Sequence, residues 1–281
     1  MVVFAICRRE VLLFYLQPNK EIKEKNKMNL NELDYYEKIG NWDFSQIKAK
    51  VEKLTDWNFY EKIKENTNEK SLCLDLGTGG GEKVLSKYPE VGMIIGADFS
   101  KEMIKTAREN MKNYPNKKVK FVCMDNLKMT FPKGIFDLVS ARHTCINAKQ
   151  IYDCLTEDGT LVVQGVDQKD CWEIKEIFGR GQAYKDKTPI SELDYKQIKE
   201  AGFTKIEKFE VLENEYYETE EDLMALLLKV PILDDCSEEF PEKFTHTKNI
   251  EKELFDKYVA KYKTEKGILL KRVLYGIIAK K

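Results

Sequence analysis

Short apolar runs alternate along the chain with longer stretches whose apolar positions recur at helical spacing. The runs are rich in β-branched residues, and they predict strands at 71–76, 91–98, 118–125, 135–141, 159–166, 203–212 and 271–280. The longer stretches predict helices at 82–87, 101–111, 147–155, 171–178 and 190–201. Strands that alternate with helices are typical of a parallel sheet covered by helices. The pattern therefore predicts an α/β fold.

The same pattern divides the chain into a core with additions at one end and in one loop. The first apolar run is interrupted by Arg8, Arg9 and Glu10 and is followed by a Lys-rich stretch, so it predicts an extension or poorly packed arm; the alternative is a short strand or helix docked on the domain. The predicted parts are the extension at 1–27, N-terminal helices at 28–66, the core at 67–212, a helical insertion at 213–269 and a final core strand at 270–281.

The insertion separates two strands that a short turn would join, and an insertion of this length commonly acts as a lid. The alternatives are a structural buttress or an oligomer contact. Its first ten residues, 213–222, contain six acids and no Lys or Arg, so a surface built from them would repel phosphates. Apolar residues interleaved with the acids predict an enclosed, largely apolar pocket, and they are Tyr216, Tyr217, Leu223, Leu226, Leu227, Val230 and Ile232.

A glycine-rich turn, Asp75–Gly81, joins the first predicted strand to the first predicted helix. Glycines there let the backbone turn tightly and approach a ligand, and the N–H groups at a helix start favour polar or anionic groups. A dinucleotide fingerprint beginning at Gly77 would need glycine at position 82, where the chain has Glu82, and no G-K-[ST] closes the turn. The turn therefore predicts neither a nicotinamide dinucleotide site nor a phosphate-binding loop.

Three predicted strands end in a carboxylate. Asp98 comes 23 residues after Asp75, and Asp125 ends the next strand. The carboxyl ends of parallel strands meet at one edge of a sheet, where such folds bind ligands, and an acid at the position of Asp98 accepts both hydroxyls of a ribose. Carboxylates so placed fit a cofactor with an amine, a ribose and an adenine amino group, which describes S-adenosylmethionine.

Five blocks of the chain, in order, resemble the motifs of the class I S-adenosylmethionine-dependent methyltransferases, in particular their small-molecule branch. The blocks are LDLGTGGGE at 74–82, GADFSKEMIKTAREN at 96–110, FVCMDNLKMTFP at 121–132, FDLVSARH at 136–143 and LTEDGTLVVQGV at 155–166. The resemblance is close over about residues 70–166 and looser to the end of the chain. We expect a Rossmann-like, seven-stranded, mostly parallel sheet with an antiparallel last strand, helices on both faces, and the helical insertion between the last two strands.

The resemblance implies the cofactor-binding residues. Asp75 would lie near the amino group of S-adenosylmethionine, Asp98 would take the ribose, and Asp125 would accept the adenine amino N–H. The full set is Asp75, Gly77, Thr78, Gly79, Asp98, Phe99, Met103, Asp125, Asn126 and Leu127, in which Gly77 and Gly79 line the methionine portion, Met103 packs on the adenine, and the backbone of Asn126 or Leu127 closes the adenine edge. The alternatives are a turn cap for Asp75, a core side chain for Met103 and the start of a loop for Asp125.

His143 follows the fourth predicted strand, beside the expected position of the sulfonium methyl. Methyl transfer is an in-line displacement that chiefly needs alignment in a dry pocket, so a base is not obligatory. If the acceptor is a protonated nucleophile, His143 is the candidate catalytic residue, acting as general base. The alternative is a hydrogen-bonded residue that shapes the loop.

Composition narrows the choice of partner. The chain has 47 Lys and Arg against 48 Asp and Glu, so its net charge of -1 gives no field that would attract nucleic acid. Seven cysteines without a C-x-x-C pair, and two histidines, predict reduced thiols in a cytoplasmic protein and no metal site. No membrane span or export signal is apparent. We predict methyl transfer to a small, neutral or cationic molecule; an RNA base methyltransferase or a non-catalytic, regulatory S-adenosylmethionine-binding protein are the alternatives.

Overall fold

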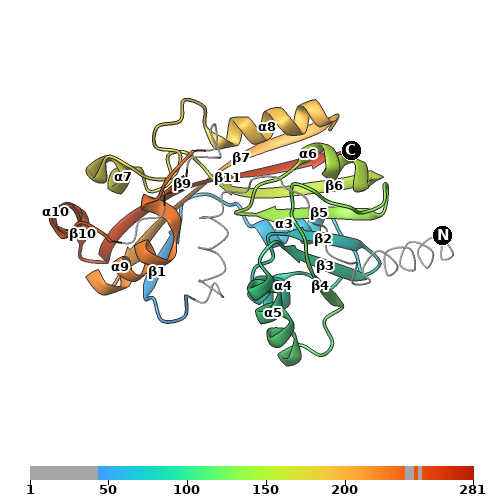
Figure 1. Ribbon diagram of the computed structural model, residues 1–281, viewed down its shortest axis with the longest axis horizontal. Helices are drawn as coiled ribbons and strands as arrows, with labels where there is room; N and C mark the ends of the chain where they lie inside the picture. The colour runs from blue at the N-terminus through green and yellow to red at the C-terminus, as the bar shows by residue number, and fades with distance from the viewer. Residues whose placement is uncertain (1–43, 238–243, 246–248) are drawn as a thin grey trace.

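The computed structural model describes residues 44–237, 244–245 and 249–281 (Figure 1). Its main feature is one large sheet, in which five neighbouring strands are parallel and the strand after them runs antiparallel. In spatial order the strands are β1 (Ala49–Lys53), β7 (Lys205–Tyr217), β11 (Gly267–Lys280), β6 (Leu155–Val166), β5 (Phe136–Arg142), β2 (Leu72–Leu76), β3 (Met93–Asp98) and β4 (Val119–Cys123), and β10 (Lys263–Thr264) pairs with β11 outside this path. The predicted α/β fold with its reversed last strand is confirmed, and β1 and β10 extend the sheet.

Helices cover both faces of the sheet. Successive strand residues point to opposite faces. Leu74 and Val139 belong to a buried cluster that includes residues of α6 and α8, whereas Cys73 and Leu138 belong to one that includes residues of α3, α4 and α5. The bounds are α3 (Phe59–Glu65), α4 (Glu82–Lys87), α5 (Lys101–Asn110), η1 (Met111–Asn113), α6 (Ala148–Cys154), α7 (Trp172–Phe178) and α8 (Ile190–Ala201). No helix in the described ranges is long and apolar enough to cross a membrane.

The prediction of helices over 28–66 is wrong for part of residues 44–66, which the structure describes. Phe59–Glu65 is helical and begins at Asn58, whose side chain accepts hydrogen bonds from two backbone N–H groups of the first turn. Ala49–Lys53, however, forms a strand, because the outer part of β7 offers it a free edge. Val51 and Leu54 are spaced as on one face of a helix, but each is 54% exposed, so they form no buried helix face. The predicted extension at 1–27 and the helix expected over 28–43 lie outside the described residues.

β7 and β11 continue as a hairpin past the carboxyl ends of the parallel strands. β11 pairs with β6 only from Leu274, opposite Val166 at the carboxyl end of β6, whereas its pairing with β7 continues outward to Ile268 and Tyr217. At roughly 3.3 Å per residue, this hairpin extension (212–217 and 267–273) reaches about 20 Å beyond β6. The extension therefore projects from the sheet edge at which the predicted cofactor residues lie.

The insertion is built on the end of the hairpin extension, as Figure 1 shows for α9 and α10. Its elements are α9 (Glu220–Lys229), η2 (Pro231–Leu233), β8 (Asp235–Cys236), β9 (Phe244–Thr245) and α10 (Lys252–Tyr262). Most of the apolar residues expected to line a pocket pack instead into a closed cluster with α7 and α10; Tyr217 is 2% exposed and Leu223 fully buried. The helices of the insertion lie off the main core, so they bury their apolar faces against one another.

Candidate active site

The glycine-rich turn after β2 is packed against two neighbouring segments. Gly77 has φ +70°, and a Cβ on it would lie 2.6 Å from the Thr144 Cβ. Gly81 has φ +76° and precedes α4; a Cβ there would lie 2.8 Å from Cζ of Phe121 on β4. Only glycine combines these positive φ angles with so little space. The turn is therefore fixed in place between β4 and the loop that follows β5.

Two buried carboxylates frame the turn. Asp98, at the end of β3, accepts the Gly79 N–H through Oδ2 at 2.9 Å and the Ser100 N–H through Oδ1 at 3.0 Å. Asp75, 5% exposed, accepts the Ser140 hydroxyl through Oδ1 at 2.7 Å. Burial raises the pKa of both carboxyl groups. Each carboxylate oxygen has more than one acceptor site, so both side chains keep capacity for donors on a ligand.

Cofactor binding should depend on pH through Asp75. Burial raises the pKa of Asp75 from 3.8 to about 6, although the Ser140 hydroxyl partly opposes the shift. The folded protein therefore favours the protonated acid, whose contribution to stability is lost as pH rises through about 6. An ammonium group near Asp75 favours the ionised form, so affinity for S-adenosylmethionine should rise between about pH 5 and pH 7. Calorimetry across this range tests the effect, and Asp75→Asn should flatten the profile.

The residues predicted around the adenine lie on α5 and on the loop after β4. Met103 is 1% exposed, and its N–H donates to the Ser100 hydroxyl that caps α5. Asp125 Oδ1 accepts the Leu127 N–H at 2.9 Å, so Asp125 does begin a loop and the Leu127 N–H already has a partner. Leu127 is 41% exposed, and Phe99 follows β3. The backbone N–H of Leu127 is therefore a poor candidate for closing the adenine edge.

Two buried side-chain atoms near the turn lack a hydrogen-bond partner within the described residues, the Thr78 hydroxyl oxygen and the Asn126 amide oxygen. The Thr78 hydroxyl lies close enough to lower the pKa of Asp75 but makes no hydrogen bond of ordinary geometry with it. The Asn126 amide nitrogen donates to the Thr144 hydroxyl at 3.0 Å, which leaves its carbonyl oxygen as an unused acceptor. A buried acceptor without a partner in the protein favours a ligand that donates a hydrogen bond to it. An amine-bearing, ribose-bearing ligand such as S-adenosylmethionine fits these groups.

His143 has an unusual backbone and an unforeseen partner. Its φ is +54°, rare for a residue with a side chain, and its N–H donates to the Gln164 carbonyl at 2.8 Å. The imidazole Nε2 lies 3.2 Å from the Gln164 amide nitrogen, and the Gln164 amide oxygen accepts the Trp57 indole N–H at 2.7 Å. Gln164 was not foreseen from the sequence, although a glutamine inside an apolar strand is the kind of signal that marks such a residue.

The surroundings of His143 disfavour its charged form. His143 is an exposed residue at the carboxyl edge of the sheet, but its ring hydrogen bond to Gln164 is partly buried, and burial lowers the pKa of the imidazole well below the usual value. The guanidinium groups of Arg142 and Arg272 lower this pKa further. His143 is thus neutral at neutral pH.

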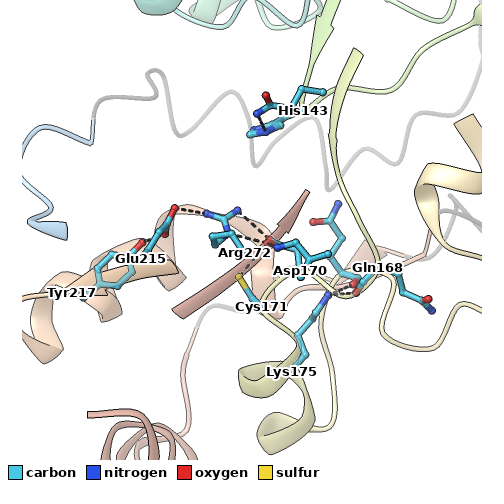
Figure 2. Close-up of polar contacts among 11 residues, drawn as sticks. His143, Gln168, Asp170, Cys171, Lys175, Glu215, Tyr217 and Arg272 are labelled. Carbon is cyan, nitrogen blue, oxygen red and sulfur yellow. Dashed lines mark hydrogen bonds and ion pairs between the residues drawn. The ribbon is translucent and has the colours of Figure 1, made fainter. Parts of the chain in front are cut away.

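A second polar group, also missed from the sequence, lies across from His143 (Figure 2). We call Asp170, Glu215, Tyr217 and Arg272 the Arg272 cluster. The Arg272 guanidinium donates to both Asp170 oxygens, at 2.9 and 3.0 Å, and to Glu215 at 3.0 Å. Tyr217 donates to the other Glu215 oxygen. The cluster connects the loop after β6 to both strands of the hairpin extension.

Comparison with known proteins agrees with the geometry of the turn. Residues 73–160 match a family model described as a methyltransferase domain. Residues 73–160 thus form a methyltransferase domain of the class I S-adenosylmethionine-dependent family. S-adenosylmethionine is accordingly its cofactor. The roles of the individual site residues remain predictions.

Curated relatives match only part of this chain. A carboxy-S-adenosyl-L-methionine synthase from Helicobacter pylori is 30% identical over 113 residues, which are 37% of this chain and 46% of the relative. The chain thus spans about half the length of the curated relatives it matches. Among solved structures, the YcgJ protein from Bacillus subtilis aligns with a TM-score of 0.52 at 13% identity, over 79% of this chain and 96% of that one. A putative methyltransferase from Bacillus halodurans aligns with a TM-score of 0.47 at 18% identity, over 79% and 96%.

Proposed function

We propose that this methyltransferase transfers the methyl group of S-adenosylmethionine to a small molecule held beside His143. The observation that carries the proposal is the hairpin extension, which projects from the carboxyl edge of the sheet and brings the Arg272 cluster opposite His143. Acceptors in such folds lie at this edge, next to the cofactor. The insertion on the extension would cover the site as a lid and exclude water.

Bound S-adenosylmethionine supplies an activated methyl group: a lone pair of the acceptor forms a bond to the methyl carbon while the carbon–sulfur bond breaks and its electron pair remains on sulfur. The chain's part is alignment. Asp75 would pair with the amino group and Asp98 would hold the ribose. Asp125 would accept from the adenine amino group, and the Asn126 amide oxygen is a further acceptor beside it. Alignment in a dry pocket supplies most of the rate of such a displacement.

Charge favours a small acceptor over RNA. The first turn of α9 is acidic, with Glu220, Glu221 and Asp222, and the Arg272 cluster has two carboxylates for one guanidinium. A polyphosphate chain passing these groups would be repelled. A neutral or cationic molecule of modest size would not.

Incubation with methyl-labelled S-adenosylmethionine tests the proposal. We expect label in the small-molecule fraction of a cell extract and little in total RNA, with Asp98→Ala as a variant deficient in cofactor binding. Efficient, salt-sensitive labelling of RNA would show that the acceptor is RNA and not a small molecule. Tight cofactor binding without label in any fraction would favour the regulatory alternative. The relatives include carboxy-S-adenosyl-L-methionine synthases, so the cofactor is also analysed by mass spectrometry after the incubation. Formation of a carboxylated S-adenosylmethionine would show that the enzyme modifies the cofactor itself and does not transfer its methyl group.

A further inference from the structure

Three neighbouring strands build a niche for Trp57. Gln164 on β6, Gly276 on β11 and Phe209 on β7 lie side by side in register. A Cβ on Gly276 would come within 2.5 Å of the Trp57 ring, so the indole lies directly over this glycine. The Phe209 ring packs against it with centroids 4.9 Å apart. Trp57 is 6% exposed, and its position is therefore fixed.

The fixed indole determines which way the Gln164 amide faces. An indole N–H can only donate, so the Gln164 oxygen must face Trp57, at 2.7 Å. The amide NH₂ then faces His143 Nε2, at 3.2 Å, and Nε2 must accept. A neutral imidazole with an accepting Nε2 carries its hydrogen on Nδ1. Turning the amide over would set NH₂ against the indole N–H and leave both donors unpaired.

We propose that Gln164, held by Trp57, fixes His143 as a neutral Nδ1–H donor, and that this N–H orients a carbonyl or carboxylate oxygen of the acceptor. His143 is then an orienting residue and not a general base. The orienting role rests on the proposed function, whereas the tautomer does not. Gln164 is then a positioning residue. The acceptor is a molecule whose nucleophile needs no base from the enzyme, such as an unprotonated amine that carries a nearby oxygen.

The unusual backbone of His143 agrees with this role. A positive φ in a residue with a side chain is costly and persists where surrounding structure fixes it, often at functional sites. Here the main-chain and side-chain bonds of His143 both go to Gln164. The low pKa of the imidazole, caused by burial and by Arg142 and Arg272, keeps the ring uncharged at neutral pH. A general base would need a free ring lone pair, and the one on Nε2 is occupied.

Nitrogen NMR of the full chain measures the tautomer directly. The chain has two histidines, so ¹⁵N-labelled imidazoles give two sets of signals, and the set lost in His143→Asn is that of His143. We expect a protonated Nδ1 and an unprotonated Nε2 throughout the neutral pH range. A hydrogen on Nε2 in the wild-type protein would overturn the proposal.

Gln164→Glu should reverse the tautomer, because a carboxylate accepts from the Trp57 indole and the imidazole Nε2–H at once. The His143 pKa should rise in the same variant. Gln150→Glu is the matched control: Gln150 also accepts through its amide oxygen, from the Met129 N–H, but lies on α6. It should leave the His143 signals in place. No change of tautomer in Gln164→Glu would remove Gln164 as the positioning residue.

Turnover in the labelling assay tests the orienting role. Asparagine at 143 keeps an N–H donor near the Nδ1 position and tolerates positive φ, whereas glycine keeps the backbone and removes the donor. His143→Asn should therefore retain at least about 10-fold more turnover than His143→Gly. Equal losses of about 10²-fold or more in both variants would indicate a base and overturn the proposal. If the wild type labels no fraction, the proposed function and the orienting role both fail, while the tautomer measurement stands.

Discussion

Replacing Asp98 with alanine should weaken S-adenosylmethionine binding by about 2–4 kcal/mol, the cost of losing two hydrogen bonds to a charged acceptor. The Asp98 carboxylate would have two roles in this structure. It would take the ribose hydroxyls, and it already holds the Gly79 and Ser100 N–H groups that shape the turn and the start of α5. Calorimetry with the cofactor and with its demethylated product measures the loss.

Asp137→Ala controls for the general effect of removing a carboxylate bonded to the backbone. Asp137 accepts the Leu72 N–H at 2.8 Å, but Leu72 begins β2, so the bond lies at the opposite edge of the sheet from the turn. This variant should bind the cofactor as the wild type does, with a comparable loss of stability. If Asp98→Ala keeps wild-type affinity, Asp98 does not take part in cofactor binding.

The features that the sequence predicted well have local causes. The glycine-rich turn needs positive φ at Gly77 and Gly81 whatever surrounds it, and the acids at the strand ends are placed by strand length alone. Short apolar runs likewise identified every strand of the core, because the central parallel strands are buried on both faces by helices. The fold followed from these local signals.

The features that the sequence did not predict depend on register between distant strands. Trp57 and Gln164 are 107 positions apart, and Asp170 and Arg272 are 102 apart. Each residue alone has an ordinary explanation: Trp57 as a helical core position, and Arg272 as the polar start of a terminal strand. Only the pairing of β6 with β11 and of β11 with β7 brings the partners together.

Gly276 illustrates the same limit. A glycine inside a strand weakens it and commonly marks a close approach of another group, but the sequence does not say which. In the structure that group is the indole of Trp57, more than two hundred residues earlier in the chain. The strand β1 was misassigned for a related reason, since its partner, the outer half of β7, was expected to belong to the insertion.

Arg272→Ala should lower the free energy of unfolding by about 3–5 kcal/mol, because it leaves buried carboxylates without their counter-charge. Asp170 is 3% exposed, and Arg272 occupies both of its oxygens, one of which also accepts the Val273 N–H at 2.9 Å. Chemical denaturation followed by circular dichroism measures the change. The neighbouring Lys271→Ala is the control: its ion pair with Glu173 is 2.7 Å long but the lysine is 50% exposed, so removing it should cost about 0–1 kcal/mol.

The double variant Arg272→Met with Asp170→Asn separates the effect of the unpaired charge from the effect of the lost side-chain volume. It removes one unpaired buried carboxylate, so it should recover part of the stability lost in Arg272→Ala. Both Arg272 variants should keep affinity for S-adenosylmethionine, since the cluster contacts the hairpin extension and not the glycine-rich turn. Turnover should fall in both, because the extension that would carry the lid loses its connection to the loop after β6. A loss in Arg272→Ala no larger than in Lys271→Ala would show that the cluster does not hold the extension in place.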